Sequence, residues 1–375
     1  MLIKTLVLAT AFLGLVAAAS PGRAGALDDV LAHALEGSKV PALGILLIQD
    51  DKVAGLAVRG VRRMDGADPV RLDDSWHIGS DGKAMTVAMV ARLVEQGKLS
   101  WTTPLSKMMP ELAATMQAQY RDVTLVQLLS HHTGLPHDIV DEKVVQDFFT
   151  HTSNGSLTEQ RKAYIARALQ DAPVGPTSAF NYSNTGLLIA AVAAERATGK
   201  PYEELMRTEV FAPLGMTHAG FGLTHSGQPQ GHLQGRVATP ADGNPPFFAP
   251  AGNMFMPLSD WARFCIDQLE GDAGRGKLLK TETYRLTHTA QPGGGGMGWG
   301  VQETIAGRAG PVLAHAGSDG SWMAIVALFP GRGTGVLITA NAGEEMGGDA
   351  ADKAAFKQVL DRLSPPVAAA PAKPN

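Results

Sequence analysis

The strongest constraint on the fold is the position of the strand-like segments, which lie at both ends of the chain with helix-like segments between them. The strands near the N-terminus are joined by a short polar turn, which is typical of a hairpin. Because layers of secondary structure must bury their apolar faces against one another, the two groups of strands predict one antiparallel sheet built from both ends. The expected strands are residues 40–49, 53–59, 298–304, 321–329 and 335–340.

The helix-like segments carry apolar residues at helical spacing. They are residues 27–37, 84–96, 158–169, 187–197, 202–211 and 350–363. We expect an α/β (α+β) fold in which residues 27–103 and 291–364 form the sheet with its flanking helices. Residues 104–290 would form an inserted, mostly helical region. A groove between these two parts is the natural place for a functional site.

Composition narrows the function classes. Hydrophobic residues make up 45% of the 375 residues, so the chain can bury a large core and is not disordered as a whole. The formal net charge is −4 and no basic run interleaves with the few aromatic residues, so we expect no nucleic-acid binding. The single cysteine, Cys265, can form neither an intramolecular disulfide nor a cysteine-based zinc site.

Residues 1–26 have the order of a secretory signal peptide. Lys4 precedes an apolar run, and small residues follow up to Ala26. The run is shorter than the about 20 residues that span a membrane, so we expect cleavage after Ala26, or alternatively after Ala19. The mature protein would then be periplasmic or secreted, with no membrane association. Residues 365–375, rich in Pro and Ala, are expected to form a disordered tail.

Ser80 and Lys83 are the first candidates for chemistry. They lie three residues apart just before a helix-like segment, a spacing that lets Lys83 reach the Ser80 hydroxyl. Burial lowers the pKa of a lysine, and a neutral amine can remove the hydroxyl proton. If Ser80 begins the helix, its N–H lies at the positive end of the helix dipole and can stabilise an oxyanion. The structural alternative is a serine N-cap followed by a solvated lysine.

Two further patterns carry polar groups suited to acyl transfer. Tyr182 and Asn184 lie in a loop before an apolar helix. A phenol near a cation can ionise and pass protons, and an amide can hold a substrate carbonyl, although a simple turn explains the same residues. His315 and Gly317 lie beside a predicted strand, whose edge could run along a substrate, and the Ser318 N–H could be a second oxyanion donor.

Taken in order, these patterns resemble the SxxK, YxN and K/HxG motifs of the serine hydrolase superfamily of class C beta-lactamases, penicillin-binding DD-peptidases and related esterases. The flanks resemble that family too, in Trp-His-Ile-Gly at residues 76–79 and Leu-Leu-Ser-His-His-Thr-Gly-Leu-Pro at residues 128–136. The likeness extends over about residues 27–345. It implies the same fold as the strand pattern does.

The resemblance also implies roles. Ser80 would be the acylated nucleophile, Lys83 its activating partner, and Tyr182 the group that passes protons to the leaving group. The residues implied to bind substrate are Asn184, His315, Gly317 and Ser318. The oxyanion hole would consist of the N–H groups of Ser80 and Ser318. No cofactor or metal is implied, and the partner would be a small-molecule or peptide substrate that is cleaved at an ester or amide bond.

Two positions depart from the family pattern. Most beta-lactamases and peptidases of the family have lysine where this chain has His315, and a neutral histidine attracts a substrate carboxylate less strongly. This favours an ester or amide substrate, with beta-lactams and D-alanyl-D-alanine or other D-amino-acid peptides as the alternative. Gly82 replaces a side-chain-bearing residue and is expected to loosen the first helical turn.

Other readings remain open from the sequence. A catalytically inactive relative that binds peptides would have the same fold. A metal site could use a group of neighbouring residues, His131, His132, His137 and Asp138. Residues 293–298 match the letters of a dinucleotide-binding loop but do not lie between a strand and a helix in the required unit.

Overall fold

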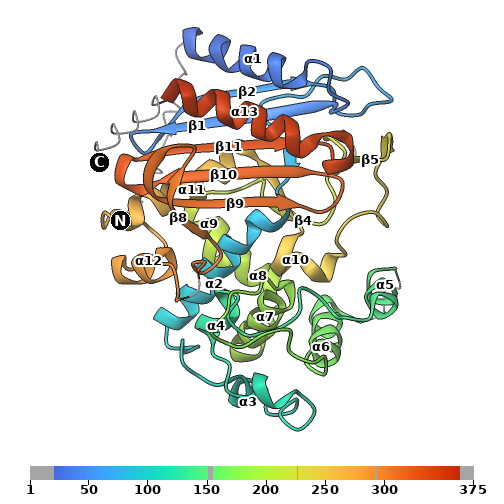
Figure 1. Ribbon diagram of the computed structural model, residues 1–375, viewed down its shortest axis with the longest axis vertical. Helices are drawn as coiled ribbons and strands as arrows, with labels where there is room; N and C mark the ends of the chain where they lie inside the picture. Colours follow the sequence, from blue (N-terminus) through green and yellow to red (C-terminus); the bar gives the residue numbers. More distant parts are fainter. Residues whose placement is uncertain (1–20, 151–154, 226, 293, 364–375) are drawn as a thin grey trace, which may run out of the picture.

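The computed structural model describes residues 21–150, 155–225, 227–292 and 294–363, and its centre is a six-stranded antiparallel sheet with the order β2-β1-β11-β10-β9-β8 (Figure 1). The strands are β1 (Ala42–Gln49), β2 (Lys52–Gly60), β8 (Gly300–Ile305), β9 (Arg308–Ser318), β10 (Met323–Phe329) and β11 (Thr334–Ala340). The predicted sheet built from both ends of the chain is confirmed, because β1 pairs with β11 as well as with β2.

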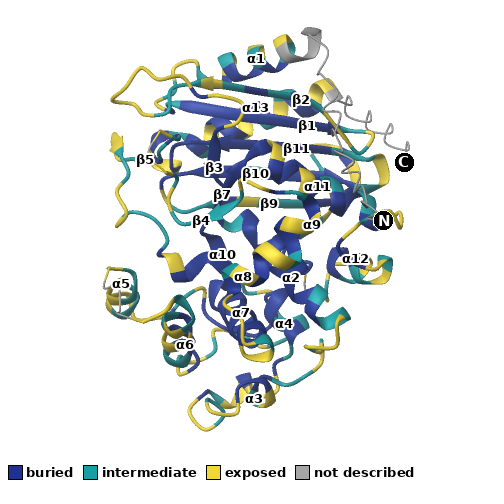
Figure 2. Cartoon of the chain, turned by 180° about the vertical axis from the view of Figure 1, so that it is seen from behind, coloured by how far each residue is buried: buried dark blue, intermediate teal, exposed yellow. Residues whose placement is uncertain are grey.

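The β1–β11 pair joins the two ends of the sequence. Leu43 lies opposite Ala340 and Ile45 opposite Ile338. All but the last residue of β1 are buried, because helices cover both faces of the sheet (Figure 2). Its side chains therefore alternate between two hydrophobic cores instead of between a core and solvent.

The first core lies under the terminal helices. The helices α1 (Pro21–Leu35) and α13 (Gly348–Leu363) lie against the same face of the sheet (Figure 1). Val30 and Leu31 of α1 and Val359 of α13 are buried there with Ile45. Helix α1 starts within the predicted signal segment, whereas residues 1–20 and the predicted tail lie outside the described residues.

The second core lies on the opposite face and continues into the helical region. The helix α11 (Leu258–Gly271) packs on this face of the sheet, although it belongs to the segment predicted as inserted. A Cβ atom at Gly44 would lie 2.8 Å from the Leu258 side chain, so the glycine allows α11 to approach β1 closely. Figure 2 shows α11 on this side of the sheet, seen from behind.

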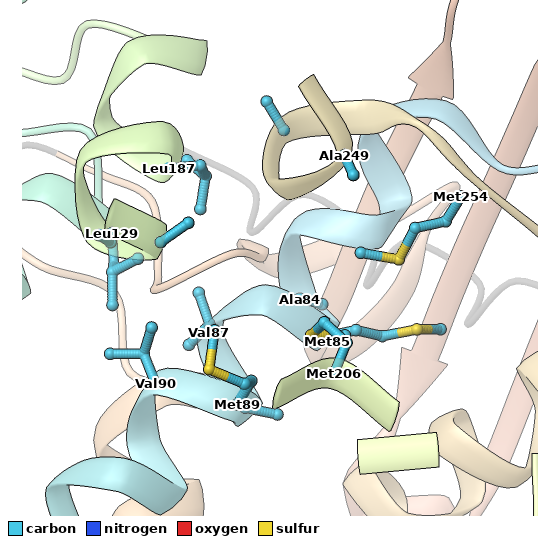
Figure 3. Close-up of a cluster of buried hydrophobic side chains, with 14 of the residues drawn as sticks. Ala84, Met85, Val87, Met89, Val90, Leu129, Leu187, Met206, Ala249 and Met254 are labelled. Carbon is cyan, nitrogen blue, oxygen red and sulfur yellow. The ribbon is translucent and has the colours of Figure 1, made fainter. Parts of the chain in front are cut away.

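Helix α2 (Lys83–Glu95) is the central element of the second core. Only Arg92, Val94 and Glu95 of its residues are not buried, so it is apolar on nearly every side, as expected for a helix enclosed by others. Around it lie α4 (Leu125–Leu129), α7 (Asn184–Thr198) and α8 (Tyr202–Met206). Figure 3 shows its side chains in contact with those of Leu129, Leu187, Met206, Ala249 and Met254. This packing fixes the end of α2 that carries Lys83.

Smaller elements complete the fold. The helices are α3 (Leu105–Met108), α5 (Glu142–Thr150), α6 (Leu157–Ala168), α9 (Ala212–Leu214), α10 (Ala249–Gly252) and α12 (Thr281–His288). The short strands are β3 (Ser75–His77), β4 (Gly220–Phe221), β5 (His232–Leu233), β6 (Arg236–Val237) and β7 (Met254–Pro257). Strands β3, β7 and β4 form a separate small sheet. No helix within the described ranges is long and apolar enough to cross a membrane.

The structure corrects two local predictions. Strand β9 was not predicted, because Gly310 and Pro311 interrupt its pattern. The predicted helix 202–211 is α8 followed by a wider π-helical turn, Arg207–Phe211. Strand β7 pairs with β3, and its Met254 carbonyl also accepts from the Ile78 N–H. This pairing holds the segment that leads directly to Ser80.

A buried acid in α13 leads to a stability prediction. Asp352 is fully buried, and neither of its carboxylate oxygens has a hydrogen-bond partner within the described residues. Burial raises its pKa far above the ordinary value, with the negative charges of Asp81 and Asp349 adding to the increase. The folded protein therefore binds a proton that the unfolded chain has lost, so this residue lowers stability increasingly as pH rises above the unfolded pKa.

We expect Asp352→Asn to raise the melting temperature at pH 8 by several degrees, with the gain disappearing below about pH 3, where the acid is neutral in both states. Thermal unfolding followed by circular dichroism across this pH range measures it. Asp349→Asn is the matched control, because Asp349 is half-buried and already paired with Lys353. An equal gain at both pH values would show that the carboxylate is not buried unpaired.

Candidate active site

Ser80 and Lys83 meet at the start of α2. Ser80 lies in a short 3₁₀ turn, Gly79–Gly82, that leads directly into the helix. The Lys83 ammonium nitrogen donates to Ser80 Oγ over 2.8 Å, and it also donates to the Ala251 carbonyl oxygen. Lys83 is completely buried, whereas Ser80 is partly accessible. The arrangement is therefore not that of a serine cap with a solvated lysine.

Burial sets the protonation of this amine. It lowers the pKa of Lys83 from its ordinary value to about 7, against the opposing effect of the Asp138 and Asp81 carboxylates. A large fraction of the Lys83 side chain is then neutral at pH 7, next to the hydroxyl. A neutral amine at hydrogen-bond distance can accept the Ser80 proton.

The backbone of β9 presses against the turn that holds Ser80. Gly79 has a φ of +51°, and a Cβ atom there would lie 2.3 Å from the Ser318 backbone nitrogen. A Cβ atom at Gly317 would lie 2.1 Å from the Ile78 carbonyl oxygen and 2.9 Å from the Ser80 nitrogen. Only glycine fits at either position. This close approach brings the backbone amides of Ser80 and Ser318 together, as an oxyanion hole requires.

Gly82 has a packing reason of its own. A Cβ atom at this position would lie 3.1 Å from the Met254 sulfur, so a larger residue would push against β7. Gly82 is buried and keeps right-handed helical angles, with a φ of −62°. The predicted loosening of the first turn is therefore not seen.

Tyr182 lies over the amine. Its ring centroid is 4.9 Å from Lys83 Nζ. Burial raises the pKa of the phenol well above its ordinary range, which favours the protonated phenol in the resting site. His131 stacks on the ring at 4.6 Å between centroids. Burial, and then the charge of Lys83, lower the pKa of His131 to about 3, so this ring is neutral.

Asn184 begins α7 and is buried. Its amide donates to Asp138 Oδ2 over 3.2 Å, and Asp138 also accepts from the Tyr164 hydroxyl. His137 lies 2.6 Å from the same carboxylate. Asp138 thus connects the start of α7 to the region around Lys83, whose pKa it raises. The sequence pointed to Asp138 only as a possible metal ligand.

The metal hypothesis finds no support in these contacts. His131 Nδ1 accepts from the Ser183 N–H, and His132 Nδ1 lies 3.1 Å from Ser130 Oγ. The part of the chain that the structure describes contains no group of three or more His, Cys, Asp or Glu side chains placed to hold a metal ion. The fully buried Cys265 has a strongly raised pKa, which makes it a packing residue of α11.

His315 reaches the same site from β9. Its Nδ1 atom lies 3.0 Å from Asp81 Oδ1 and 3.0 Å from the Ala316 carbonyl oxygen. A carbonyl oxygen can only accept, so Nδ1 carries a proton. The rings of His315 and Tyr182 are 6.3 Å apart between centroids.

Sequence reasoning missed Asp81. This residue lies inside the Ser80-to-Lys83 motif, is fully buried, and has one carboxylate oxygen that finds no hydrogen-bond partner among the described residues. Burial raises its pKa, while the hydrogen bond to His315 and the charge of Lys83 lower it. Asp81 therefore connects the turn that carries Ser80 to strand β9. The only signal in the sequence is an acid next to a proposed nucleophile.

Comparisons with known proteins identify the family and related chains. The family model named Beta-lactamase matches residues 27–360. Protein flp of Staphylococcus aureus (strain N315) is 24% identical over 332 residues, covering 85% of this chain. That match covers only 63% of the staphylococcal protein. The D-alanyl-D-alanine-carboxypeptidase/endopeptidase AmpH of Escherichia coli (strain K12) is 25% identical over 83% of this chain and 82% of its own length.

Solved structures show the same fold. The octameric penicillin-binding protein homologue from Pyrococcus abyssi has a TM-score of 0.73 at 22% identity, covering 90% of this chain and 77% of that one. SurE with D-Leu also has a TM-score of 0.73, at 19% identity, covering 95% of this chain and 79% of that one.

The buried amine leads to a prediction on stability. The folded pKa of Lys83 is depressed, so its burial is most destabilising below about pH 7, where both states are charged, and less so as pH rises toward 10.5. We expect Lys83→Met to raise the melting temperature most at pH 6. Lys98→Met, an exposed lysine just beyond α2, is the control and should show no such gain. A destabilised Lys83→Met protein at pH 6 would contradict this account of the site.

The position of Asp81 leads to a prediction on pH dependence. Its charge raises the pKa of Lys83, so Asp81→Asn should move the acid limb of kcat/KM to lower pH. At its optimum pH, we expect the variant to lose at most about 10²-fold, the scale of a displaced positioning group. Asp73→Asn, an exposed carboxylate before β3, is the control. A purely structural role would lower stability and leave the acid limb in place.

Proposed function

The chain belongs to the Beta-lactamase family, and we propose from this premise that it is a serine hydrolase that cleaves an ester or amide bond through an acyl-enzyme on Ser80. The observation that carries the proposal is the buried Lys83 amine, with a pKa of about 7, at 2.8 Å from Ser80 Oγ. A binding protein has no need for a buried amine that is neutral near physiological pH.

The proposed acylation uses groups already in contact. Neutral Lys83 accepts the Ser80 proton as Oγ forms a bond to the substrate carbonyl carbon. The negative charge that develops on the carbonyl oxygen is stabilised by the N–H groups of Ser80 and Ser318. Neutral Tyr182 then gives its proton to the leaving oxygen or nitrogen as that bond breaks, and the Lys83 ammonium returns a proton to the phenol. The protons balance, and both residues end as they began.

Deacylation follows the same path in reverse. A water molecule loses a proton to Lys83, directly or through Tyr182, and its oxygen attacks the ester carbon. The bond to Ser80 Oγ breaks and the serine regains its proton from the Lys83 ammonium. This sequence needs no cofactor, and the same oxyanion donors serve both steps.

His315 supports neutral substrates over carboxylate-bearing ones. Its Nδ1 atom is hydrogen-bonded to the buried Asp81 carboxylate, whose charge opposes any charge on the ring, so this position attracts a substrate carboxylate less strongly than a free lysine would. The second candidate is a D-alanyl-D-alanine peptidase, which the similarity to the carboxypeptidase/endopeptidase AmpH favours. Turnover of a short 4-nitrophenyl ester, a chromogenic cephalosporin and a D-amino-acid amide in parallel separates these substrates.

We also propose that the protein is exported and acts in the periplasm or outside the cell. The proposal rests on the order of charged, apolar and small residues in positions 1–26. N-terminal sequencing of the protein recovered from its native cells tests it. A mature protein that begins after Ala26 or Ala19 supports export, and an intact Met1 in the cytoplasm contradicts it.

The assignment of Ser80 and Tyr182 is tested by substitution. We expect Ser80→Ala to lower turnover by at least about 10⁴-fold and to abolish labelling by a fluorophosphonate. Tyr182→Phe should lower kcat by about 10²–10⁴-fold and leave the label on Ser80 detectable. Ser106→Ala, a serine outside the site, is the control. Undiminished hydrolysis by the Ser80 variant would exclude the proposed mechanism.

A further inference from the structure

A cavity of about 460 Å³ opens beside Tyr182 and His315. Its walls are mainly apolar, and the large side chains in them are Phe180, Trp299, Ile305, Ile325, Val326 and Phe356. Phe180 lies at the edge of the cavity with 42% of its surface exposed, an unusual position for a phenylalanine in a soluble protein. A volume of this size is typical of sites for small organic ligands.

The cavity follows the open edge of β9. Strand β8 pairs with β9 only as far as Gly300, which lies opposite Ala314. Beyond this point the β9 edge has no β8 partner, and residues of both segments, Trp299 and Ala316, line the cavity. His315 points from β9 toward Asp81, so its neighbours Ala314 and Ala316 point to the opposite face of the sheet. Their small side chains leave room that extends toward α13.

The cavity is also lined from the side of the first core, against which Phe356 packs. Ile325 of β10 and Phe356 of α13 lie there. The cavity therefore connects the catalytic side of the sheet to the side covered by α13. A substrate bound at Ser80 could extend past the edge of β9 into this space.

The charges around the cavity favour an uncharged ligand. Lys353 is the only lysine or arginine among the described lining residues, and its ammonium donates to Asp349 over 2.8 Å while 67% of its side chain is exposed. The Nδ1 atom of His315, which also lines the cavity, is hydrogen-bonded to Asp81. Tyr182 is protonated and His131 is neutral, for the reasons given above. A substrate carboxylate in the cavity would lose its hydration without gaining a buried cation as an ion-pair partner.

We propose that this cavity binds a hydrocarbon group of the substrate, so that the preferred substrates are neutral esters or amides with an apolar chain of several carbons. This inference rests on the proposed acyl-enzyme at Ser80. The chain could belong to the acyl part or to the alcohol or amine part of the substrate. In both cases the protein would recognise the substrate by burying its methylene groups against Phe356, Ile325 and Trp299.

The experiment compares two ester series with the full-length mature protein. In one, the acyl chain of 4-nitrophenyl esters increases from acetate to decanoate. In the other, the alcohol of alkyl acetates increases from methyl to octyl. We expect kcat/KM to rise by about fourfold per added methylene over several carbons in one series and then to level off. The series that responds identifies which part of the substrate enters the cavity.

Two variants connect the response to the cavity. Ala316 is exposed and lines the cavity, so the larger side chain of Ala316→Leu would fill part of the space. We expect this variant to reduce the increase of kcat/KM with chain length and to change kcat/KM for the acetate ester by less than about threefold. Phe356→Ala enlarges the cavity and should move the plateau to longer chains. Leu72→Ala, an exposed apolar residue elsewhere, is the control and should leave the series unchanged. A folding defect in one variant leaves the other to decide.

The outcomes separate the two proposals. If short esters are hydrolysed and Ser80 is labelled by a fluorophosphonate but both series are flat, the cavity does not bind a hydrocarbon chain and the hydrolase assignment stands. A length dependence that neither cavity variant alters also overturns the inference. If no ester is hydrolysed and Ser80 takes no label, the hydrolase proposal fails and the inference fails with it.

Discussion

Burial of the Lys83 amine is the physical constraint on which the site depends. Removing an ammonium from water is unfavourable, so a buried lysine near neutral pH exists partly as the neutral amine. The fold compensates with two acceptors, Ser80 Oγ and the Ala251 carbonyl, and with the negative charges of Asp81 and Asp138 nearby. The same burial that destabilises the folded chain leaves a neutral amine next to Ser80, and this amine can accept the proton of the Ser80 hydroxyl when the oxygen attacks.

The sheet explains how residues far apart in the sequence meet at this amine. Pairing of β1 with β11 joins the two ends of the chain, and β10 and β9 follow from β11. Strand β9 then lies against the turn before α2, because glycine at positions 79 and 317 allows backbone to touch backbone. Asp81 and His315 strengthen this contact by a hydrogen bond between the turn and the strand. The unpaired edge of β9 and the cavity beside it are further consequences of where β8 ends.

The sequence predicted the parts of the fold that depend on local pattern. The buried strand β1 and the helix α2 have long apolar runs, and their predicted bounds differ from the observed ones by one or two residues. Strand β9 was not predicted, because its glycines and proline have low strand propensity. These residues are present for tertiary contacts that a local pattern does not show. The predicted residues Ser80, Lys83, Tyr182 and His315 are close together, but the role of Asp81 depends on a histidine more than 200 positions later. No local pattern contains that contact.

The protonation state of Lys83 tests the account most directly. With ¹³C-labelled lysine, NMR titration of the side-chain resonance that disappears in Lys83→Arg gives the pKa of this one amine. The account predicts a pKa near 7 in the folded protein. A pKa near the ordinary value of about 10.4 would mean a permanently charged ammonium beside Ser80, and the proposed activation of the serine would then be wrong.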